Sequence, residues 1–427
     1  MSLRSRPMHR LLRTTLLLSL PLLSACEQPP PPQPATQTIR GQLPGYPNPG
    51  PAYAGAKVMI PGHAPVTPDA SGVFEIPGVQ TPYDLVVHYP AANGTGFVVL
   101  VQGLQRNDPT LPANYSATRR AQVSGTFSGP SFPLPAGRKL AVVFETPLSI
   151  GAQGTFTEST YSHEVTWPDA ESMTGTLHAM ELGTDPSTGQ QTYGAYGRRE
   201  GVTLTQGSAL SGQDIALSPI GTASITGRVT DIPGQTLQKT SVTLEIANER
   251  GMSLFSYSPA TSDFQLAVPD LAGATFKVQA SLSGRGDLEY TQVWKTGVRA
   301  GTTDLVLTAP APTRLLSPAS KAQVDDLSAG FSWEGPPRAL YQFDLLASVG
   351  GEPHYQVIQV ITTETHVTVP DLSPLGLTAS RRGASYSWMV SAYGPVESVE
   401  EWMWFTPRPS ESRFSSGSGL SSFTTAP

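Results

Sequence analysis

The sequence has one cysteine in 427 residues, which excludes any disulfide within the chain. Charged residues make up only 14% of it, and no apolar run reaches the roughly 18–20 residues that cross a membrane as a helix. Glycine and proline, in contrast, contribute 41 residues each and interrupt the chain every few positions. Long helices need uninterrupted helix-forming residues, so the composition argues against a helical bundle or a repeating βα enzyme. The composition predicts an all-β protein of several domains.

The first 25 residues combine positive charge with a short apolar stretch. Four arginines precede residues 14–25 (TTLLLSLPLLSA), and Cys26 follows directly. This order is typical of an export signal, and the apolar stretch is too short for a transmembrane helix. Residues 23–26 (LSAC) resemble the lipobox of bacterial lipoproteins. The resemblance implies that residues 1–25 are a lipoprotein signal peptide and that Cys26 is lipidated; the alternative is an ordinary secretory signal with an incidental cysteine.

Removal of the signal leaves 23 basic and 33 acidic residues, a net charge of −10. Such a surface, with six lysines in total, argues against charge-driven binding to nucleic acid or anionic lipid. We therefore expect the protein to contact the membrane through acyl chains on Cys26. The residue after Cys26 is Glu27, whereas an aspartate at this position retains lipoproteins at the inner membrane of some Gram-negative bacteria. These features predict an extracytoplasmic, lipid-anchored protein of the bacterial cell envelope, at the outer membrane or the cell surface.

Residues 26–38 include five prolines and show no apolar periodicity, so we expect an extended tether. Beyond it a five-residue pattern recurs, with the order apolar, polar, glycine, polar, apolar. It is found at residues 39–43 (IRGQL), 123–127 (VSGTF) and 225–229 (ITGRV). The spacings of 84 and 102 residues are the size of a β-sandwich. We therefore predict three sandwiches, called here the first, second and third modules, over residues 39–121, 122–219 and 220–310.

These modules resemble the Ig-like, transthyretin-like modules related to carboxypeptidase regulatory domains. The resemblance depends on the repeated opening segments and on later strands of the first and third modules, 72–79 (GVFEIPGV) and 263–271 (DFQLAVPDL). The second module lacks the Phe-x-Ile/Leu-Pro part of this signature, which leaves its topology open. Segments 212–217 and 301–307 are expected to close the second and third modules.

Residues 311–427, the fourth module, have a different pattern. Trp333 lies on an early predicted strand, and aromatic and aliphatic residues alternate along 341–345 (YQFDL) and 386–392 (YSWMVSA). The module resembles a fibronectin type III-like β-sandwich, which implies that Trp333 packs against aromatic residues of a late strand. The Ser- and Gly-rich residues 410–419 are expected to form a flexible loop, followed by an edge strand at 420–425. The fold class predicted for the whole chain is all-β, with tandem β-sandwich domains in a row.

The sequence contains no recognisable catalytic pattern. It has no Gly-x-Ser-x-Gly, no His-Glu-x-x-His and no phosphate-binding Gly-x-x-x-x-Gly-Lys. Asp325 and Asp326 lack the spacing of a calcium loop. His163 and Glu164 are neighbours on a predicted strand and point to opposite faces, so His163 is expected to be a partly buried structural residue beside Val165 and Trp167. We predict no catalytic residue, no metal site and no cofactor.

Trp402 and Trp404 are the best candidates for a binding surface. Two-residue periodicity would place both on one face of a strand, with Met403 and Phe405 on the other. They either pack in the core or form an exposed aromatic pair that binds a sugar or a protein partner. The favoured function is a non-enzymatic envelope lipoprotein that acts as a structural or protein-binding module, its partner an unidentified envelope protein or polysaccharide. Alternatives are a carbohydrate- or cell-wall-binding surface protein and, third, a hydrolase.

Overall fold

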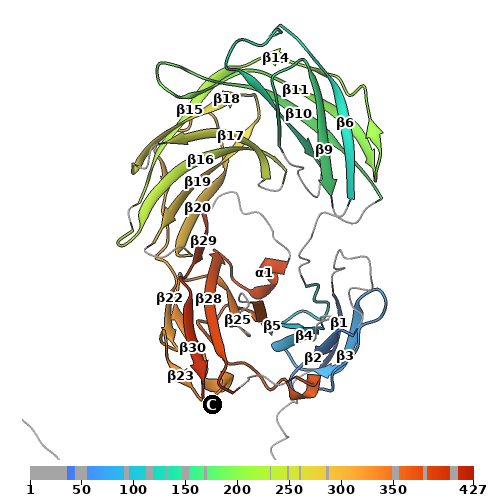
Figure 1. Ribbon diagram of the computed structural model, residues 1–427, viewed down its shortest axis with the longest axis vertical. Helices are drawn as coiled ribbons and strands as arrows, with labels where there is room; N and C mark the ends of the chain where they lie inside the picture. The colour runs from blue at the N-terminus through green and yellow to red at the C-terminus, as the bar shows by residue number, and fades with distance from the viewer. Residues whose placement is uncertain are drawn as a thin grey trace, which may run out of the picture. The chain divides into compact units, whose positions relative to one another are not determined.

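Strands make up almost all of the regular structure in the computed structural model (Figure 1), which confirms the predicted all-β fold class. Within the described residues, the other regular elements are the helix α1 (Val399–Met403) and the 3-10 turns η1 (Leu327–Ala329) and η2 (Ser373–Leu375). The structure describes residues 36–43, 55–90, 96–111, 119–130, 132–146, 153–167, 171–230, 232–247, 250–258, 261–284, 288–348, 355–377, 382–403 and 412–427.

In the first module, an antiparallel pair of strands faces a three-stranded sheet. Strand β1 pairs with β3, and β4 pairs with both β2 and β5. The side chains between them form a hydrophobic cluster that includes Ile39, Phe74 and Leu85, all at most 3% exposed. The strands are β1 (Gln37–Gln42), β2 (Lys57–Met59), β3 (Val73–Val79), β4 (Tyr83–Tyr89) and β5 (Phe97–Leu104).

The second module has two sheets around a core that contains Trp167, with β6 and β9 in one sheet and β7, β10 and β11 in the other. Leu140, Val142 and Phe144 all face this core, as their alternation predicts. The strands are β6 (Arg119–Ser128), β7 (Lys139–Glu145), β8 (Gly154–Phe156), β9 (Thr160–Trp167), β10 (Ser172–Thr184), β11 (Gln191–Thr205), β12 (Ala209–Leu210), β13 (Ile215–Ala216) and β14 (Ser218–Pro219).

The third module packs a three-stranded sheet, β18-β15-β21, against β16, β17, β19 and β20. Alternating buried positions along β19 follow the two-residue period of a strand with one face in a core. The strands are β15 (Gly221–Val229), β16 (Thr236–Ala247), β17 (Arg250–Ser258), β18 (Asp263–Asp270), β19 (Thr275–Ser283), β20 (Tyr290–Val298) and β21 (Leu305–Leu307).

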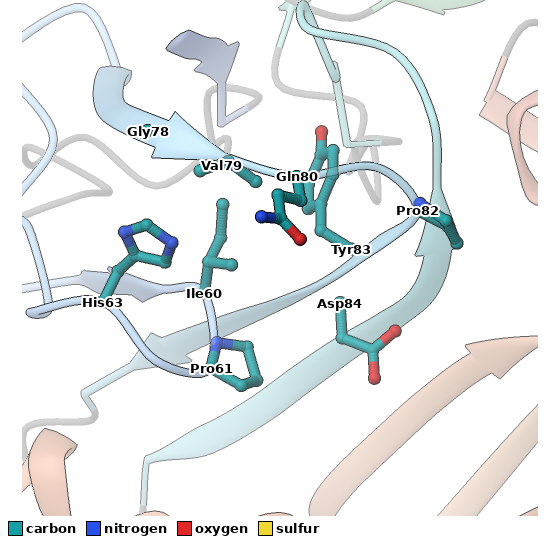
Figure 2. A pocket seen from close by; sticks show the side chains of 9 residues that line it. All are labelled: Ile60, Pro61, His63, Gly78, Val79, Gln80, Pro82, Tyr83 and Asp84. Carbon is teal, nitrogen blue, oxygen red and sulfur yellow. The ribbon is translucent and has the colours of Figure 1, made fainter. Parts of the chain in front are cut away.

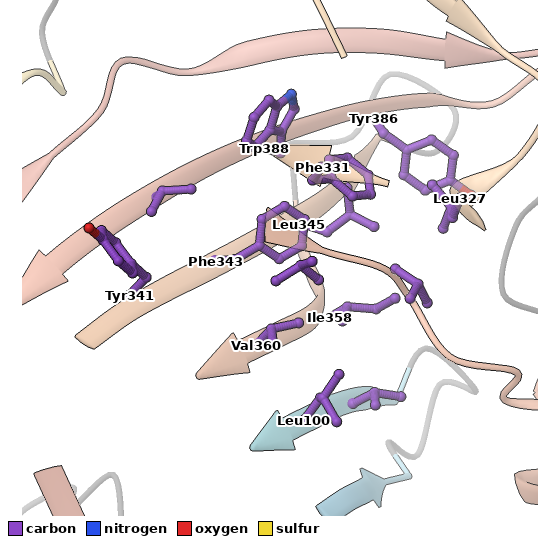
Figure 3. Packing of buried hydrophobic residues seen from close by; sticks show 14 of the residues in the cluster. Leu100, Leu327, Phe331, Tyr341, Phe343, Leu345, Ile358, Val360, Tyr386 and Trp388 are labelled. Carbon is purple, nitrogen blue, oxygen red and sulfur yellow. The ribbon is translucent and has the colours of Figure 1, made fainter. Parts of the chain in front are cut away.

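The fourth module has the most aromatic core (Figure 3). Trp388 is fully buried, and its ring centroid lies 5.4 Å from that of Phe331 and 5.9 Å from that of Phe343. Trp333 stacks on Phe343 at 6.3 Å, so its aromatic neighbour lies on β25. It is Phe331, on the same strand as Trp333, that contacts Trp388 of the late strand β28. The strands are β22 (Arg314–Ser317), β23 (Gln323–Val324), β24 (Phe331–Glu334), β25 (Leu340–Ser348), β26 (Tyr355–Thr362), β27 (His366–Val367), β28 (Ser385–Gly394), β29 (Arg413–Gly417) and β30 (Ser421–Thr425).

The expected loop at residues 410–419 is wrong for its central part, which forms strand β29. This strand pairs antiparallel with β20 of the third module on one side and with β28 of the fourth on the other. Ser415 and Ser416 are 6% and 0% exposed, and the hydroxyl of Ser416 lies 3.1 Å from that of Thr313. Ser415 and Ser416 are small, and the Ser416 hydroxyl has a partner, which allows the centre of this strand to be buried between its neighbours.

A single 13-stranded sheet therefore contains strands of three modules. Besides the β20–β29–β28 connection, β5 of the first module pairs in parallel with β26 of the fourth, with Val99 opposite Gln359. The second module joins the third differently, because β7 is buried on both faces: Val142 lies in the core of the second module and Val143 in that of the third. Modules far apart in sequence are thus direct neighbours, an arrangement that a simple row of sandwiches does not have.

Candidate functional site

Asp84 lines two cavities, one within the first module and one formed by the first and fourth modules together. The first, called here the β2–β4 cavity, has a volume of about 470 Å³ and lies within the first module (Figure 2). Its polar side chains come from His63, Gln80, Tyr83 and Asp84, and its apolar ones include Ile60 and Val79.

The second, called here the junction cavity, has a volume of about 450 Å³ and is formed by both modules. Its lining residues are Asp84, Gln102, Gly103, Thr362, Thr363, Glu364, His366, Thr368 and Pro370. Volumes of this size are within the range of small-ligand sites in proteins.

The parallel pairing of β5 and β26 explains why residues so distant in sequence meet at the junction cavity. Parallel strands end on the same side of a sheet, so the last residues of β5 lie next to the turn that follows β26. That turn is held by the hydroxyl of Thr362, which accepts a hydrogen bond of 3.0 Å from the backbone N–H of Glu364. His366 then begins β27, which pairs with β24.

A β-bulge directs the side chains at the start of β4. Leu85 pairs with Val101 but Tyr83 pairs with Leu104, so Asp84 faces two residues, Gln102 and Gly103. Gly103 has φ +76°, in the left-handed region that glycine adopts without strain, and its N–H donates a 3.0 Å hydrogen bond to Oδ1 of Asp84. Bulges of this kind re-aim side chains beside functional sites. Here the bulge fixes the Asp84 carboxylate between the two cavities.

The side chains of the junction cavity differ in burial. Thr362 is buried, Asp84 and Gln102 are half-buried, and Glu364 and His366 are exposed at the rim. Oε1 of Gln102 is buried and has no hydrogen-bond partner among the described residues. Among the described residues, the lining has two carboxylates and no lysine or arginine, so it is rich in hydrogen-bond acceptors and carries negative charge.

Tyr83 closes the β2–β4 cavity on the side of the core. Its ring and the Asp84 carboxylate leave β4 in opposite directions (Figure 2). The phenol is buried and donates a 2.7 Å hydrogen bond to the carbonyl of Arg106. Burial, together with the nearby charges of Glu400 and Asp108, raises the pKa of Tyr83 well above its ordinary value. This residue therefore stays protonated and acts as a structural donor.

The structure corrects the strand predicted around Trp402. Residues Val399–Met403 form α1, so a two-residue period does not apply to Trp402 and Met403. The helix contacts β5: Val399 is 3% exposed in the core of the first module, and Glu400 accepts a 2.5 Å hydrogen bond from the N–H of Gln105. The side chain of Trp402, all of Trp404 and Cys26 lie outside the described residues. Their roles in binding and lipidation stay predictions.

The histidine predicted to be structural and partly buried is almost fully buried. His163 is 7% exposed and shares the inner face of β9 with Val165 and Trp167, each 1% exposed. Among the described residues there is no group of three or more histidine, cysteine or acidic side chains arranged to hold a metal ion. In the same part of the chain, no helix is both long and apolar enough to span a membrane.

A second buried polar group lies in the second module and was not foreseen. His178 on β10 is 6% exposed, with Nδ1 2.7 Å from the hydroxyl of Tyr196 and Nε2 3.4 Å from a carboxylate oxygen of Glu145. Burial lowers the pKa of His178, and the interaction with Glu145 opposes this effect only in part. On the same strand the carboxylate of Glu181, 3% exposed, forms an ion pair with Arg138.

Comparison with known protein families finds no match for this chain, and comparison with curated proteins finds no similar one. The candidate site therefore has to be interpreted from its own geometry. None of the lining residues of the junction cavity was singled out by the sequence. Asp84 and Glu364 are 280 positions apart and belong to different modules, and no local pattern connects them.

Proposed function

We propose that this protein is a non-enzymatic, lipid-anchored lipoprotein of the bacterial cell envelope that acts as a structural, protein-binding module. Cys26 is the proposed site of acylation. The proline-rich residues 26–36 are the proposed tether, which is shorter than the sequence predicts because β1 already begins at Gln37. The proposed location is extracytoplasmic, at the outer membrane or the cell surface.

The observation that supports a binding role most strongly is the connection of three modules through one sheet. The β5–β26 and β20–β29–β28 pairings join strands of the first, third and fourth modules by backbone hydrogen bonds. A ladder of backbone hydrogen bonds with packed faces limits relative motion of the modules it connects. A partner that contacts the β5–β26 junction would therefore meet a preformed surface, which lowers the entropy lost on binding.

Fractionation of cells that express Cys26→Ser tests the anchor. The variant should move from the membrane pellet to the soluble extracytoplasmic fraction, because acyl chains on Cys26 are the proposed attachment. A Ser24→Thr variant, which keeps the cysteine, serves as the control and should stay in the pellet. If Cys26→Ser also stays in the pellet, the anchoring part of the proposal is wrong.

The carbohydrate-binding alternative depends on Trp402 and Trp404. It predicts that an envelope polysaccharide quenches tryptophan fluorescence in the wild type and that a Trp402→Ala, Trp404→Ala variant of unchanged fold loses this response. A response that survives both substitutions would remove these residues from the binding surface.

A further inference from the structure

We propose that the junction cavity binds a guanidinium or ammonium side chain presented by an extended, basic segment of a protein partner. The inference rests on the proposed protein-binding function and adds the chemistry of recognition. Its structural basis is the set of acceptors that the β5–β26 pairing and the Asp84 bulge bring together.

The acceptors come from two modules. Asp84 on β4 uses Oδ1 for the N–H of Gly103, and this bond fixes the direction of the carboxylate. Glu364, from the turn after β26, adds a second carboxylate at the rim. Oε1 of Gln102 on β5 has no hydrogen-bond partner in the described part of the chain, but it is buried from solvent, so a ligand reaches it only if the side chain moves. A ligand that supplies several N–H donors and positive charge satisfies the two carboxylates.

Other ligand classes fit this lining less well. Within the described residues no cluster of three or more metal-binding side chains exists, and Asp84, Glu364 and His366 are not grouped as ligands of one ion. None of the described residues that line the junction cavity is a phenylalanine, tyrosine or tryptophan, so a sugar ring finds no such aromatic face to stack on there. An anion would meet two carboxylates and, in the described lining, no lysine or arginine. A cationic side chain forms charge-assisted hydrogen bonds with these carboxylates, which are the stronger type.

The β2–β4 cavity indicates where the rest of such a segment would lie. Asp84 lines both cavities, so a chain whose cationic side chain occupies the junction cavity can place a neighbouring residue against Ile60, Val79 and Pro82. The backbone of the segment would find the amide of Gln80 and the imidazole of His63 beside it. A basic residue next to a small apolar one is the pattern that this surface selects.

The test is fluorescence anisotropy of the purified full chain with a labelled peptide, Gly-Val-Arg-Gly-Val-Arg-Gly amide, at about 0.15 M salt, where distant charges are screened. The same peptide with citrulline in place of arginine keeps the shape and removes the charge. The arginine peptide should bind and the citrulline peptide should bind roughly tenfold more weakly or worse. Equal binding of the two peptides, or no binding of the arginine peptide, would overturn the proposal.

Two pairs of substitutions of equal charge locate the site. Asp84→Asn with Glu364→Gln should weaken binding of the arginine peptide by about tenfold or more. The amide oxygen introduced by Asp84→Asn can still accept the Gly103 N–H, and the turn of Glu364 is held by Thr362, so the fold should be retained. Glu75→Gln with Glu158→Gln, at two exposed positions outside the cavity, removes the same charge and should change binding less than about twofold. A similar loss in both pairs would show non-specific attraction and contradict the proposed site.

If Asp84→Asn affects folding, Glu364→Gln alone still tests the site, because that side chain is exposed. Crosslinking in cells separates this inference from the proposed function. A partner captured equally by the wild type and by the Asp84→Asn, Glu364→Gln variant contradicts the role of the cavity and leaves the protein-binding function standing. Failure of the wild type to capture any protein contradicts the proposed function itself.

Discussion

Gly227 lies directly opposite Phe264 in the antiparallel pair of β15 and β18. A Cβ atom on Gly227 would come within 2.7 Å of the ring of Phe264 and closer still to the carbonyl oxygen of Leu305 on β21. The first module repeats this relationship: Gly41 lies opposite Phe74, whose ring leaves no room for a Cβ atom on the glycine. The glycine of the recurring sequence pattern is thus required by close packing.

The same arrangement surrounds all three opening strands. Each has an antiparallel partner on one side and a parallel closing segment on the other. The antiparallel partners of β1, β6 and β15 are β3, β9 and β18. The parallel partners, in the same order, are Thr110, β13 and β21. In the second module the carbonyl of Gln213 takes the place nearest to Gly125 and would clash with a Cβ atom there. The weak sequence repeat therefore corresponds to a repeated three-strand geometry.

Gly227→Ala should destabilise the third module by about 2 kcal/mol, because the added methyl group overpacks against Phe264 and a backbone carbonyl that cannot move independently. Urea unfolding followed by circular dichroism measures this change as a lower midpoint. Gly419, around which a Cβ would meet nothing within 4 Å, provides the control, and Gly419→Ala should shift the midpoint little. An equal shift in the two variants would contradict the packing role of Gly227.

Burial of His178 should make stability depend on pH. Its pKa is lower in the folded protein than in the unfolded chain, so the unfolded chain binds a proton more readily below about pH 6.5. The free energy of unfolding should therefore fall as the pH is lowered from about 7 towards about 5, and His178→Asn should flatten this dependence. Thermal unfolding midpoints across this range measure it. His366→Asn, at an exposed position on β27, should keep the wild-type slope, and an unchanged slope in His178→Asn would refute the assignment.

Strand β29 should tolerate only small residues at its centre. Ser416 is fully buried between β20 and β28, so Ser416→Leu should cost roughly 2–3 kcal/mol through overpacking. Ser416→Ala removes only the hydrogen bond with Thr313 and should cost about 1 kcal/mol. Chemical unfolding of both variants compares the two costs. Leucine tolerated as well as alanine would mean that β29 is not buried between these strands.

Much of the fold could be predicted from local patterns. Alternation along β25 and β28 identified strands whose inner residues, Phe343 and Trp388 among them, are fully buried. The parallel pairing of β5 and β26 could not be predicted, because it joins distant segments, Val98 with Ile358 for example, and depends on which edges are free after each module has folded. The junction cavity results from this pairing, and its residues carry no local signal.

Two local predictions failed for identifiable reasons. Residues 415–417 (SSG) are small, as loop residues often are, but a strand flanked on both sides also takes small side chains that fit between its neighbours. Residues 399–403 (VEEWM) contain apolar residues compatible with either period, and glutamate and methionine favour a helix. In both places the pattern alone fitted two structures, and tertiary packing selected between them.

Crosslinking on intact cells followed by purification of the tagged lipoprotein tests the central claim most directly. A structural, protein-binding module predicts one discrete envelope protein recovered in near-equal amount, and its recovery should decrease when Cys26→Ser releases the chain from the membrane. Recovery of polysaccharide or peptidoglycan without a protein partner would contradict the account and favour the carbohydrate-binding alternative.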